Sequence, residues 1–216
     1  MNLTPSEKLK KFFVTSKPIF YKKGEVVLRV GETRLGAFYV KSGYVKDLSV
    51  SSDGRNFNLF IFEPGDLFSY NWIYNKTPNE HTFKAMTDCT AYEKAREELL
   101  QFLEQNPDVQ FMISQKIVKR MNGLIQRMER MAFGTASQKV SSILSILAER
   151  FGKSTIRGVV IPLALTQQDL SELIGISRET TSIEIKKLLD GGVLSRHAGQ
   201  YIVHNVEKLK DDALIE

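Results

Sequence analysis

Four side chains in the C-terminal third of the chain have the types and the spacing needed to read the edges of DNA bases. They are Arg178, Glu179, Ser182 and Lys186. An Arg can donate two hydrogen bonds to guanine, a Glu can accept one from the amino group of cytosine, and a Ser can serve bases or phosphates. At intervals of one, three and four residues, these side chains share one side of a helix. The pattern predicts a polar helix face suited to the major groove.

Two helices joined by a tight turn are expected to position this face. Thr166 is a candidate N-cap for a short first helix, and Gly175 can adopt the positive φ that ends it. The apolar residues of this helix are Leu170, Leu173 and Ile174. Ser177 is a candidate N-cap for the second helix, which carries the polar face. The residues of the second helix expected to face inward are Thr181, Ile185 and Leu188. The spacing predicts a helix-turn-helix.

A small β-hairpin is expected directly after these helices. Asp190 and two glycines stop the second helix, and residues 193–203 then form two short strands around an Ala198–Gly199 turn. An ordinary αα-hairpin with a solvated polar face is the alternative interpretation of the two helices alone. Helix-turn-helix followed by a hairpin favours a winged DNA-binding domain.

The N-terminal half has a different periodicity. Residues 4–16 have the pattern of a short amphipathic helix opening at Thr4 and Pro5. From Ile19 to about Tyr92, apolar and polar residues alternate between Gly, Asn and Asp turns, as they do in strands. From about Ala95 the pattern is helical, with one break at Asn106–Pro107, and a long helix continues to about Phe133. The pattern predicts an antiparallel roll followed by helices.

The long helix carries an apolar stripe with heptad spacing. The stripe consists of Ile117, Met121, Leu124, Met128 and Met131, separated by four, three, four and three residues. Either this stripe packs on its own domain, or it pairs with the same stripe of a second chain. Methionine side chains are adaptable, so such a pairing could repack between two states.

Two segments of the chain resemble the Crp/Fnr superfamily of bacterial transcription regulators. LTQQDLSELIGISRET at 165–180, followed by KKLLDGGVL and a hairpin, resembles the C-terminal domain of that family. An independent resemblance covers the N-terminal half, where the glycine-punctuated strands are similar to a cyclic-nucleotide-binding-type β-roll. Its segments are FYKKGE at 20–25, GE at 31–32, FYVKSGYVK at 38–46, DGR at 53–55 and EPGDLF at 63–68.

The resemblance implies an α+β fold with an N-terminal antiparallel β-roll (a double-stranded β-helix, cupin-like), a long dimerisation helix and a C-terminal winged helix-turn-helix. The implied domains are a sensory β-roll at 1–107, a dimerisation helix at 108–133 and a DNA-binding domain at 134–216. A helix from Thr135 to Gly152 is similar to the family's connector, and Phe133–Gly134 is the expected hinge. In this family the long helix pairs with its twin, which favours dimerisation over packing within one chain. The expected partners are double-stranded DNA, a second copy of the chain and RNA polymerase, with no membrane.

The expected DNA interface includes more residues than Arg178, Glu179, Ser182 and Lys186. The resemblance implies that Arg178 and Glu179 contact the guanine and the cytosine of a G·C pair. Ser182 matches a further base contact in some members of the family. The position after it, frequently Arg in the family, is Ile183, which cannot hydrogen-bond to guanine. The whole expected set is Thr166, Gln168, Ser177, Arg178, Glu179, Thr180, Ser182, Ile183, Lys186, Lys187 and Arg196. The alternative is a ligand-binding or protein-interaction module whose winged helix does not read DNA.

Cyclic nucleotide is not the expected effector. In nucleotide-binding relatives a short helix supplies a Gly-Glu pair, and an Arg further along the chain neutralises the phosphate. Here residues 69–72 are Ser-Tyr-Asn-Trp, and Glu80 stands where the Arg is expected. A carboxylate would repel the phosphate. Aromatic residues could line an effector pocket or could simply form the core: Phe60, Phe62, Tyr70, Trp72 and Phe83.

No cofactor is expected. A single cysteine, Cys89, cannot build an iron-sulfur cluster within one subunit, and it is expected to be a packing residue. His81 is the best candidate for a haem ligand, but its neighbours Asn79 and Glu80 favour a surface histidine. No metal site is expected.

Composition sets wider limits. The chain has 216 residues, 42% of them hydrophobic, enough for one large or two small packed domains. The net charge of +5 favours an anionic partner only weakly. No signal peptide or membrane span is evident, so a cytoplasmic protein is expected.

The sequence contains no phosphate-binding loop and no nucleophile elbow, and its histidines at 81, 197 and 204 are scattered. No catalytic residues are assigned, and an enzyme is not expected.

Overall fold

The computed structural model describes residues 3–32 and 36–214. The chain forms two compact units, Met1–Met121 and Asn122–Glu216. The boundary between them falls within helix α3 (Pro107–Phe133), which therefore contributes to both units. The division into three domains at 107 and 133 remains a prediction.

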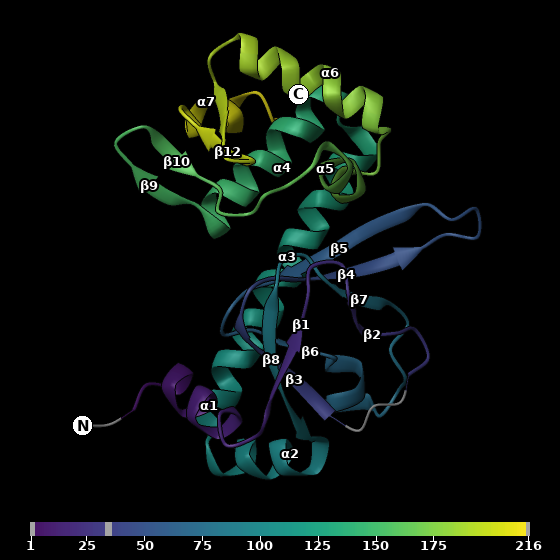
Figure 1. The fold of residues 1–216 in the computed structure, drawn as a ribbon, viewed down its shortest axis with the longest axis vertical. Coiled ribbons are helices and arrows are strands. Elements are labelled where there is room, and N and C mark those ends of the chain that lie inside the picture. Colours follow the sequence, from purple (N-terminus) through teal and green to yellow (C-terminus); the bar gives the residue numbers. More distant parts are fainter. Residues whose placement is uncertain (1–2, 33–35, 215–216) are drawn as a thin grey trace. The chain divides into compact units, whose positions relative to one another are not determined.

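Antiparallel strands form the body of the first unit (Figure 1). The strands are β1 (Pro18–Tyr21), β2 (Val26–Leu28), β3 (Gly36–Ser42), β4 (Val45–Val50), β5 (Asn56–Phe62), β6 (Leu67–Phe68), β7 (Thr82–Ala85) and β8 (Cys89–Ala95). One sheet has the order β1-β8-β3-β6, and the other has the order β2-β7-β4-β5. Their strand pairs are antiparallel. This is the antiparallel roll that the sequence predicts.

The interior of the roll is a cluster of buried side chains contributed by both sheets. Its members are Val27, Leu28, Phe38, Val40, Val45, Phe62, Phe68, Phe83, Ala85 and Cys89. Phe68 stacks on Phe38 with ring centroids 5.0 Å apart and on Phe83 at 4.9 Å. Burial of aromatic rings at such distances supplies much of the hydrophobic stabilisation of a small sheet domain.

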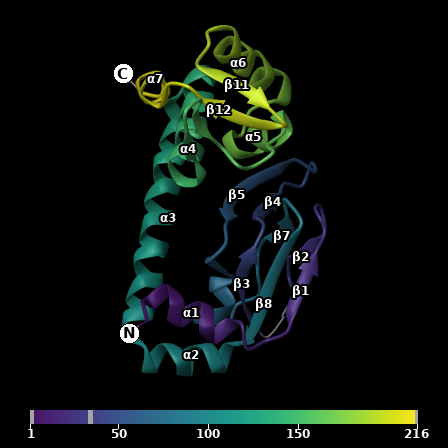
Figure 2. The same ribbon diagram turned by 60° about the vertical axis from the view of Figure 1, so that its left-hand side comes forward.

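The helices of the first unit are α1 (Pro5–Phe13), the π-helical turn η1 (Asn71–Asn75), α2 (Arg96–Gln105) and the first part of α3. Figure 2 shows α1 and α2 at one end of the roll. Thr4 caps α1 in a capping box with Glu7, as the Thr4-Pro5 sequence predicts. The residues that join these helices to β3, β6 and β8 form a second core: Leu9, Phe13, Ala37, Tyr39, Leu67, Ile73, Tyr92, Leu99, Leu103, Val109 and Ile113.

The second unit combines helices with one twisted sheet. Its helices are the second part of α3, α4 (Ala136–Phe151), α5 (Gln167–Ile174), α6 (Arg178–Asp190) and α7 (Val206–Asp211). Its strands are β9 (Lys153–Thr155), β10 (Gly158–Val160), β11 (Leu194–His197) and β12 (Gln200–Val203), in the antiparallel order β11-β12-β10-β9. Within the described residues, no helix is both long and apolar enough to cross a membrane.

The expected α+β class is confirmed. The roll, the long helix and the helix-turn-helix with its hairpin occur in the predicted order. The expected break at Asn106–Pro107 separates α2 from α3, and Pro107 begins the new helix because a proline lacks the N–H that a helix interior needs.

Candidate nucleic-acid interface and effector domain

The helix-turn-helix is set by side-chain caps at the start of both helices. Thr166 accepts a hydrogen bond from the backbone N–H of Asp169 at 3.0 Å, and the Asp169 carboxylate accepts one from the N–H of Thr166 at 3.0 Å. Gly175 ends α5 with φ of 66°, a conformation that a glycine adopts without strain. The hydroxyl of Ser177 then accepts from the N–H of Thr180 at 3.0 Å and starts α6. All three positions match the sequence prediction.

The two faces of α6 differ in the predicted way. Thr181 and Ile185 are buried, and Thr181 also donates its hydroxyl to the Ser177 carbonyl at 2.9 Å. The opposite face is polar apart from Ile183. Arg178, Glu179, Ile183, Lys186 and Lys187 are exposed on it, and Thr180 and Ser182 are half-buried. Lys187 is paired with Glu184 of the same helix at 2.8 Å, which fixes its ammonium close to the helix surface.

The hairpin beside these helices is a wing with a two-residue turn. Ala198 and Gly199 both have positive φ, of 48° and 80°, as the tight turns of β-hairpins require. The guanidinium of Arg196 lies over the Tyr201 ring, 5.2 Å from its centroid, and donates a 3.4 Å hydrogen bond to the Leu165 carbonyl. Arg196 is thus held against its own unit. Gln168 of α5 is exposed and donates to the carboxylate of Glu172 at 3.2 Å.

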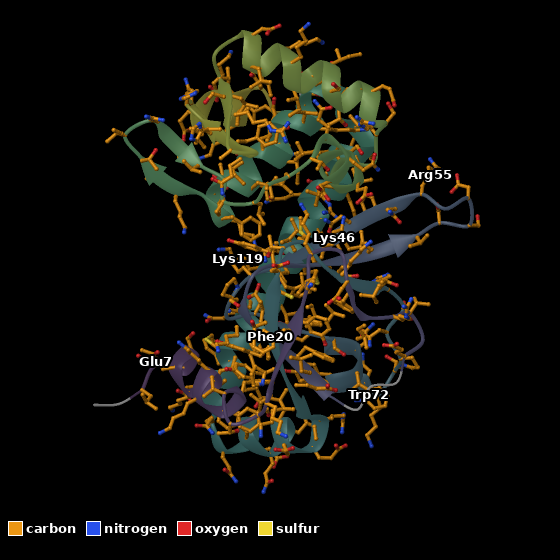
Figure 3. All side chains as sticks on the ribbon, in the orientation of Figure 1. Glu7, Phe20, Lys46, Arg55, Trp72 and Lys119 are labelled. Carbon is orange, nitrogen blue, oxygen red and sulfur yellow. The ribbon has the colours of Figure 1, made fainter. Side chains whose placement is uncertain are left out.

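The aromatic residues singled out in the first unit do not all come together. Phe62 lies 5.9 Å from Phe83 and 6.4 Å from Phe60, measured between ring centroids, and Tyr70 packs against the same cluster. Trp72, labelled in Figure 3, lies on η1 and belongs to neither of the two core clusters of this unit. The rings of Phe60, Phe62, Tyr70 and Phe83 therefore belong to the roll interior or pack against it. Their role as an effector pocket remains a prediction.

A buried ion pair ties α3 to the roll beside these rings. Nη2 of Arg120 lies 2.5 Å from Oδ2 of Asp66, and Nη1 donates to the Tyr70 hydroxyl at 2.8 Å. The guanidinium also lies 4.8 Å from the centroid of the Phe62 ring. Lys116, one turn earlier on α3, reaches the other Asp66 oxygen at 3.3 Å and the Gly65 carbonyl at 3.0 Å. Burial raises the pKa of Tyr70 to about 12, so this hydroxyl is neutral.

The other candidate chemical groups of the first unit have structural partners. Cys89 is buried in the roll interior, and burial raises its pKa to about 11. Nδ1 of His81 lies 3.3 Å from the buried carboxylate of Asp47, and the hydrogen bond to Asp47 raises the pKa of His81. Glu80 is exposed. Among the described residues, no group of three or more His, Cys, Asp or Glu side chains could hold a metal ion.

The exposed apolar residues of α3 are displaced from the stripe that the sequence indicates. Val118, Met121, Ile125 and Met128 are between 46% and 59% exposed and are spaced by three, four and three residues. Met121 and Met128 belong to both sets. Ile117 packs against the second core, and Leu124 and Met131 are half-buried. This face has the spacing of a coiled-coil a/d stripe, in a register slightly rotated from the one that the sequence indicates. Its role in dimerisation stays a prediction.

Comparisons with known proteins agree with both halves of this description. Residues 18–106 match the cyclic nucleotide-binding domain family, and residues 138–212 match the Crp-like helix-turn-helix domain family. The two matches occur in the family's domain order and together span most of the chain. The chain is a Crp/Fnr-type regulator. It is a DNA-binding regulator of transcription, as the helix-turn-helix pattern predicts.

Several relatives of this Crp/Fnr-type chain are similar along nearly its whole length. A CRP-like cAMP-activated global transcriptional regulator of Mycobacterium tuberculosis is 23% identical over 89% of this chain and 86% of its own length. A solved structure of a CooA variant from Carboxydothermus hydrogenoformans has a TM-score of 0.81 and 19% identity, covering 99% of this chain and 97% of that one. FixK2 from Bradyrhizobium japonicum has a TM-score of 0.79 and 20% identity, covering 93% and 98%. The named curated relatives are regulators of transcription.

Three features of this Crp/Fnr-type chain are absent from the sequence prediction. These are the Arg120–Asp66 pair, the β9–β10 hairpin and helix α7. The β-branched residues on both sides of Gly158 are a signal for the hairpin. Asn205 is a candidate cap for α7, where its side chain accepts from the N–H of Lys208. The ion pair joins residues 54 positions apart (120 − 66), so periodicity carries no signal for it.

Proposed function

We propose that this regulator works as a homodimer that reads an inverted repeat through one α6 helix per chain. The observation that carries the proposal is the exposed polar face of α6, which begins at a capped helix N-terminus. In a helix-turn-helix, such N-terminal residues reach base edges, and paired helices read half-sites about one helical turn, roughly 34 Å, apart. Arg178 and Glu179 would contact bases, and Lys186 would contact a phosphate.

The exposed stripe of α3 supports the dimer. Four large apolar side chains at heptad spacing are about half exposed in the single chain, although side chains of this kind are usually buried. A second copy of the same helix would cover them with an identical stripe, since a two-fold interface joins a surface to itself. Ile117, Leu124 and Met131 would flank this seam, with Met121 and Met128 at its centre.

We propose that the roll responds to an effector other than a cyclic nucleotide. Glu80 supplies an exposed carboxylate at the position expected for a phosphate-binding arginine. Arg120 of α3, which packs on Phe62 beside the aromatic cluster, is already bonded to Asp66 and Tyr70. A bound phosphate would have to replace a buried carboxylate at that guanidinium, which is costly. RNA polymerase is the proposed partner at promoters.

Light scattering on α3 variants tests the dimer. Met121→Glu with Met128→Glu should give monomers, because the seam would bury four carboxylates that have no cationic partner. Gln115→Glu with Gln126→Glu is the matched control, since it adds the same charge at exposed positions of α3 outside the stripe. A dimer that survives in the first variant as well as in the control would reject the seam.

Calorimetry tests the effector proposal. Titration of cyclic AMP or cyclic GMP into the full chain should give no heat of specific binding at micromolar concentrations. Operator affinity should not respond to either nucleotide. A tenfold increase in operator affinity on adding one of them would overturn the assignment of Glu80.

A further inference from the structure

A groove of about 240 Å³ runs across the outer face of the sheet in the second unit. The β9–β10 hairpin and the wing lie side by side in this sheet (Figure 1). Cross-strand partners share a face of a sheet, and the groove is lined by two such pairs, Val160 with Ile202 and His197 with Gln200. The residues of the opposite face are buried: Leu194, Tyr201 and Val203.

Side-chain hydrogen bonds hold the walls of the groove in place. Nδ1 of His204 lies 2.7 Å from the backbone carbonyl of Arg157, and its Nε2 lies 2.8 Å from the hydroxyl of Ser195. Because a carbonyl only accepts, His204 carries a proton on Nδ1, and its ring joins the turn of the hairpin to the wing. At the same turn, the Thr155 hydroxyl accepts from the Arg157 N–H at 3.2 Å and donates to the Gly158 carbonyl at 2.8 Å. The groove is therefore formed before a ligand binds, as ligand sites usually are.

Two polar side chains of the groove take no part in this network. Among the described residues, neither the guanidinium of Arg157 nor the ring of His197 has a hydrogen-bond or ion-pair partner. In the part of the chain that the structure describes, no Asp or Glu lines the groove. A guanidinium presents a fork of donors that matches a carboxylate, and an imidazole N–H can add one more donor. These groups favour an anionic group on the ligand.

The rest of the groove favours an apolar body. Val160 is half-buried, Ile202 is 7% exposed, and Ile156 at the turn of the hairpin is fully exposed. Three branched apolar side chains beside a few polar groups are the usual composition of a small-molecule site. The volume lies below the range of about 300 to 1,000 Å³ that drug-sized ligands occupy, so the ligand must be small.

We propose that this groove binds a small organic acid, whose carboxylate pairs with Arg157 and whose apolar body covers Ile156, Val160 and Ile202. Such a ligand would contact the β9–β10 hairpin and the wing together. It would give the DNA-binding unit an input of its own, in addition to the proposed input through the roll. Binding of the acid does not depend on whether α6 reads DNA.

An NMR titration of the full chain without DNA tests the site. Benzoate is the probe, benzamide is its neutral match, and acetate is a carboxylate without an apolar body. Benzoate should cause saturable shifts of the backbone amide signals of Arg157, His197 and Gln200. It should bind about tenfold more tightly than benzamide or acetate, because each of these lacks one of the two kinds of contact.

Variants of exposed residues locate the contacts without disturbing the core. Arg157→Gln should weaken benzoate binding about tenfold, since it removes the charged partner of the carboxylate. Ile156→Ser should weaken it about threefold through the loss of apolar contact. Lys153→Gln is the matched control, because it removes an exposed cation of the same sheet outside the groove and should keep the wild-type affinity. Equal benzoate affinities of the wild type and Arg157→Gln, or no saturable shift at millimolar benzoate, would overturn the proposal.

The DNA backbone is the competing occupant. If a DNA phosphate pairs with Arg157, benzoate gives no saturable shift, and Arg157→Gln lowers the log–log salt slope of DNA binding by about one unit. That result would overturn the organic-acid proposal and assign the groove to DNA. Because the titration contains no DNA, its result stays the same if the proposed reading of an operator by α6 fails.

Discussion

Arg120 and Asp66 form the most buried ion pair between α3 and the roll, with Nη2 and Oδ2 2.5 Å apart and side chains only 11% and 5% exposed. The carboxylate also accepts from the backbone N–H of Glu63 at 3.1 Å, and Lys116 approaches its second oxygen. The guanidinium is shared with Tyr70. These contacts fix the position of the first part of α3 along the roll. They lie where the helix meets the aromatic residues Phe62 and Tyr70.

Removing one partner of this pair should be strongly destabilising. Arg120→Met removes the closer of two α3 cations at the buried Asp66 carboxylate and should lower the free energy of unfolding by about 3 kcal/mol. Urea denaturation followed by circular dichroism measures the change. The exposed pair Arg55–Asp53, on the β4–β5 hairpin shown in Figure 3, is the control. Arg55→Met should cause a much smaller loss than Arg120→Met, because solvent screens a surface pair. Equal losses in the two variants would contradict the role of Arg120.

The His81–Asp47 pair should make stability depend on pH. The hydrogen bond to Asp47 raises the pKa of His81 above its value of 6.5 in the unfolded chain. The stabilisation is therefore complete below pH 6.5 and is lost as pH rises through the higher pKa of the folded state. Neutral His81 no longer offers a positive charge to the Asp47 carboxylate, which is only 6% exposed. The difference in urea midpoint between wild type and His81→Gln should be larger at pH 5.5 than at pH 8.5.

All other titratable groups are present in both the wild type and His81→Gln. The pH dependence of the difference between their urea midpoints therefore reports on His81 alone. His197→Gln, at an exposed position of the wing, should show no such change between the two pH values. A difference between wild type and His81→Gln that is constant from pH 5.5 to 8.5 would mean that the pair does not form in solution.

Cys89 should be unreactive in the folded protein. A thiol with a pKa of about 11 is ionised at pH 8 roughly a hundredfold less than a free cysteine. Burial in the roll interior also blocks access to the sulfur. Labelling with a thiol reagent at pH 8 should be at least a hundredfold slower than for glutathione and should become comparable in urea. Fast labelling of the native chain would contradict the burial of the Cys89 thiol and its role as a packing residue.

Local chemistry explains why the DNA-binding unit was predictable from sequence. Thr166, Gly175 and Ser177 act on backbone groups within four residues of themselves, so their roles follow from spacing alone. The same is true of the break at Pro107. The fold class followed from periodicity and from the order of the motifs.

Side-chain placement in three dimensions was less predictable. The heptad count places Ile117 and Met121 in one apolar stripe. A helix has 3.6 residues per turn, so residues on either side of such a stripe can also face a partner, and packing against the rest of the fold decides which of them are buried. Ile117 is covered by the core of the first unit, whereas Ile125 stays exposed. Arg120 has the sequence signature of a surface cation, and only the fold brings Asp66 beside it. Trp72 is close to Tyr70 in sequence, but the turn of η1 separates it from the aromatic cluster.

The outward side chains of α6 should determine the operator sequence position by position. Arg178→Ala should weaken binding to the best site by about 1 to 3 kcal/mol and flatten the preference at one base pair, because it removes a bidentate contact. Lys186→Ala should weaken all sequences alike and should lower the salt slope by about one unit, as loss of a phosphate contact does. Selection from a randomised pool of sites, repeated with each variant, separates base contacts from phosphate contacts. An unchanged motif with Arg178→Ala would rule out α6 as the reading helix.

Ile183 makes the readout specific to this chain. Its side chain is 56% exposed on the face that carries Arg178, so it is available to a base rather than to the core. An isoleucine can contact the methyl group of thymine but cannot donate to guanine, and the half-site should prefer A·T where relatives select G·C. Ile183→Arg should shift that one position towards G·C in the selected motif, whereas Ile183→Val should leave it at A·T. If the arginine variant recovers the wild-type motif, residue 183 does not face a base, and its apolar character has no part in operator choice.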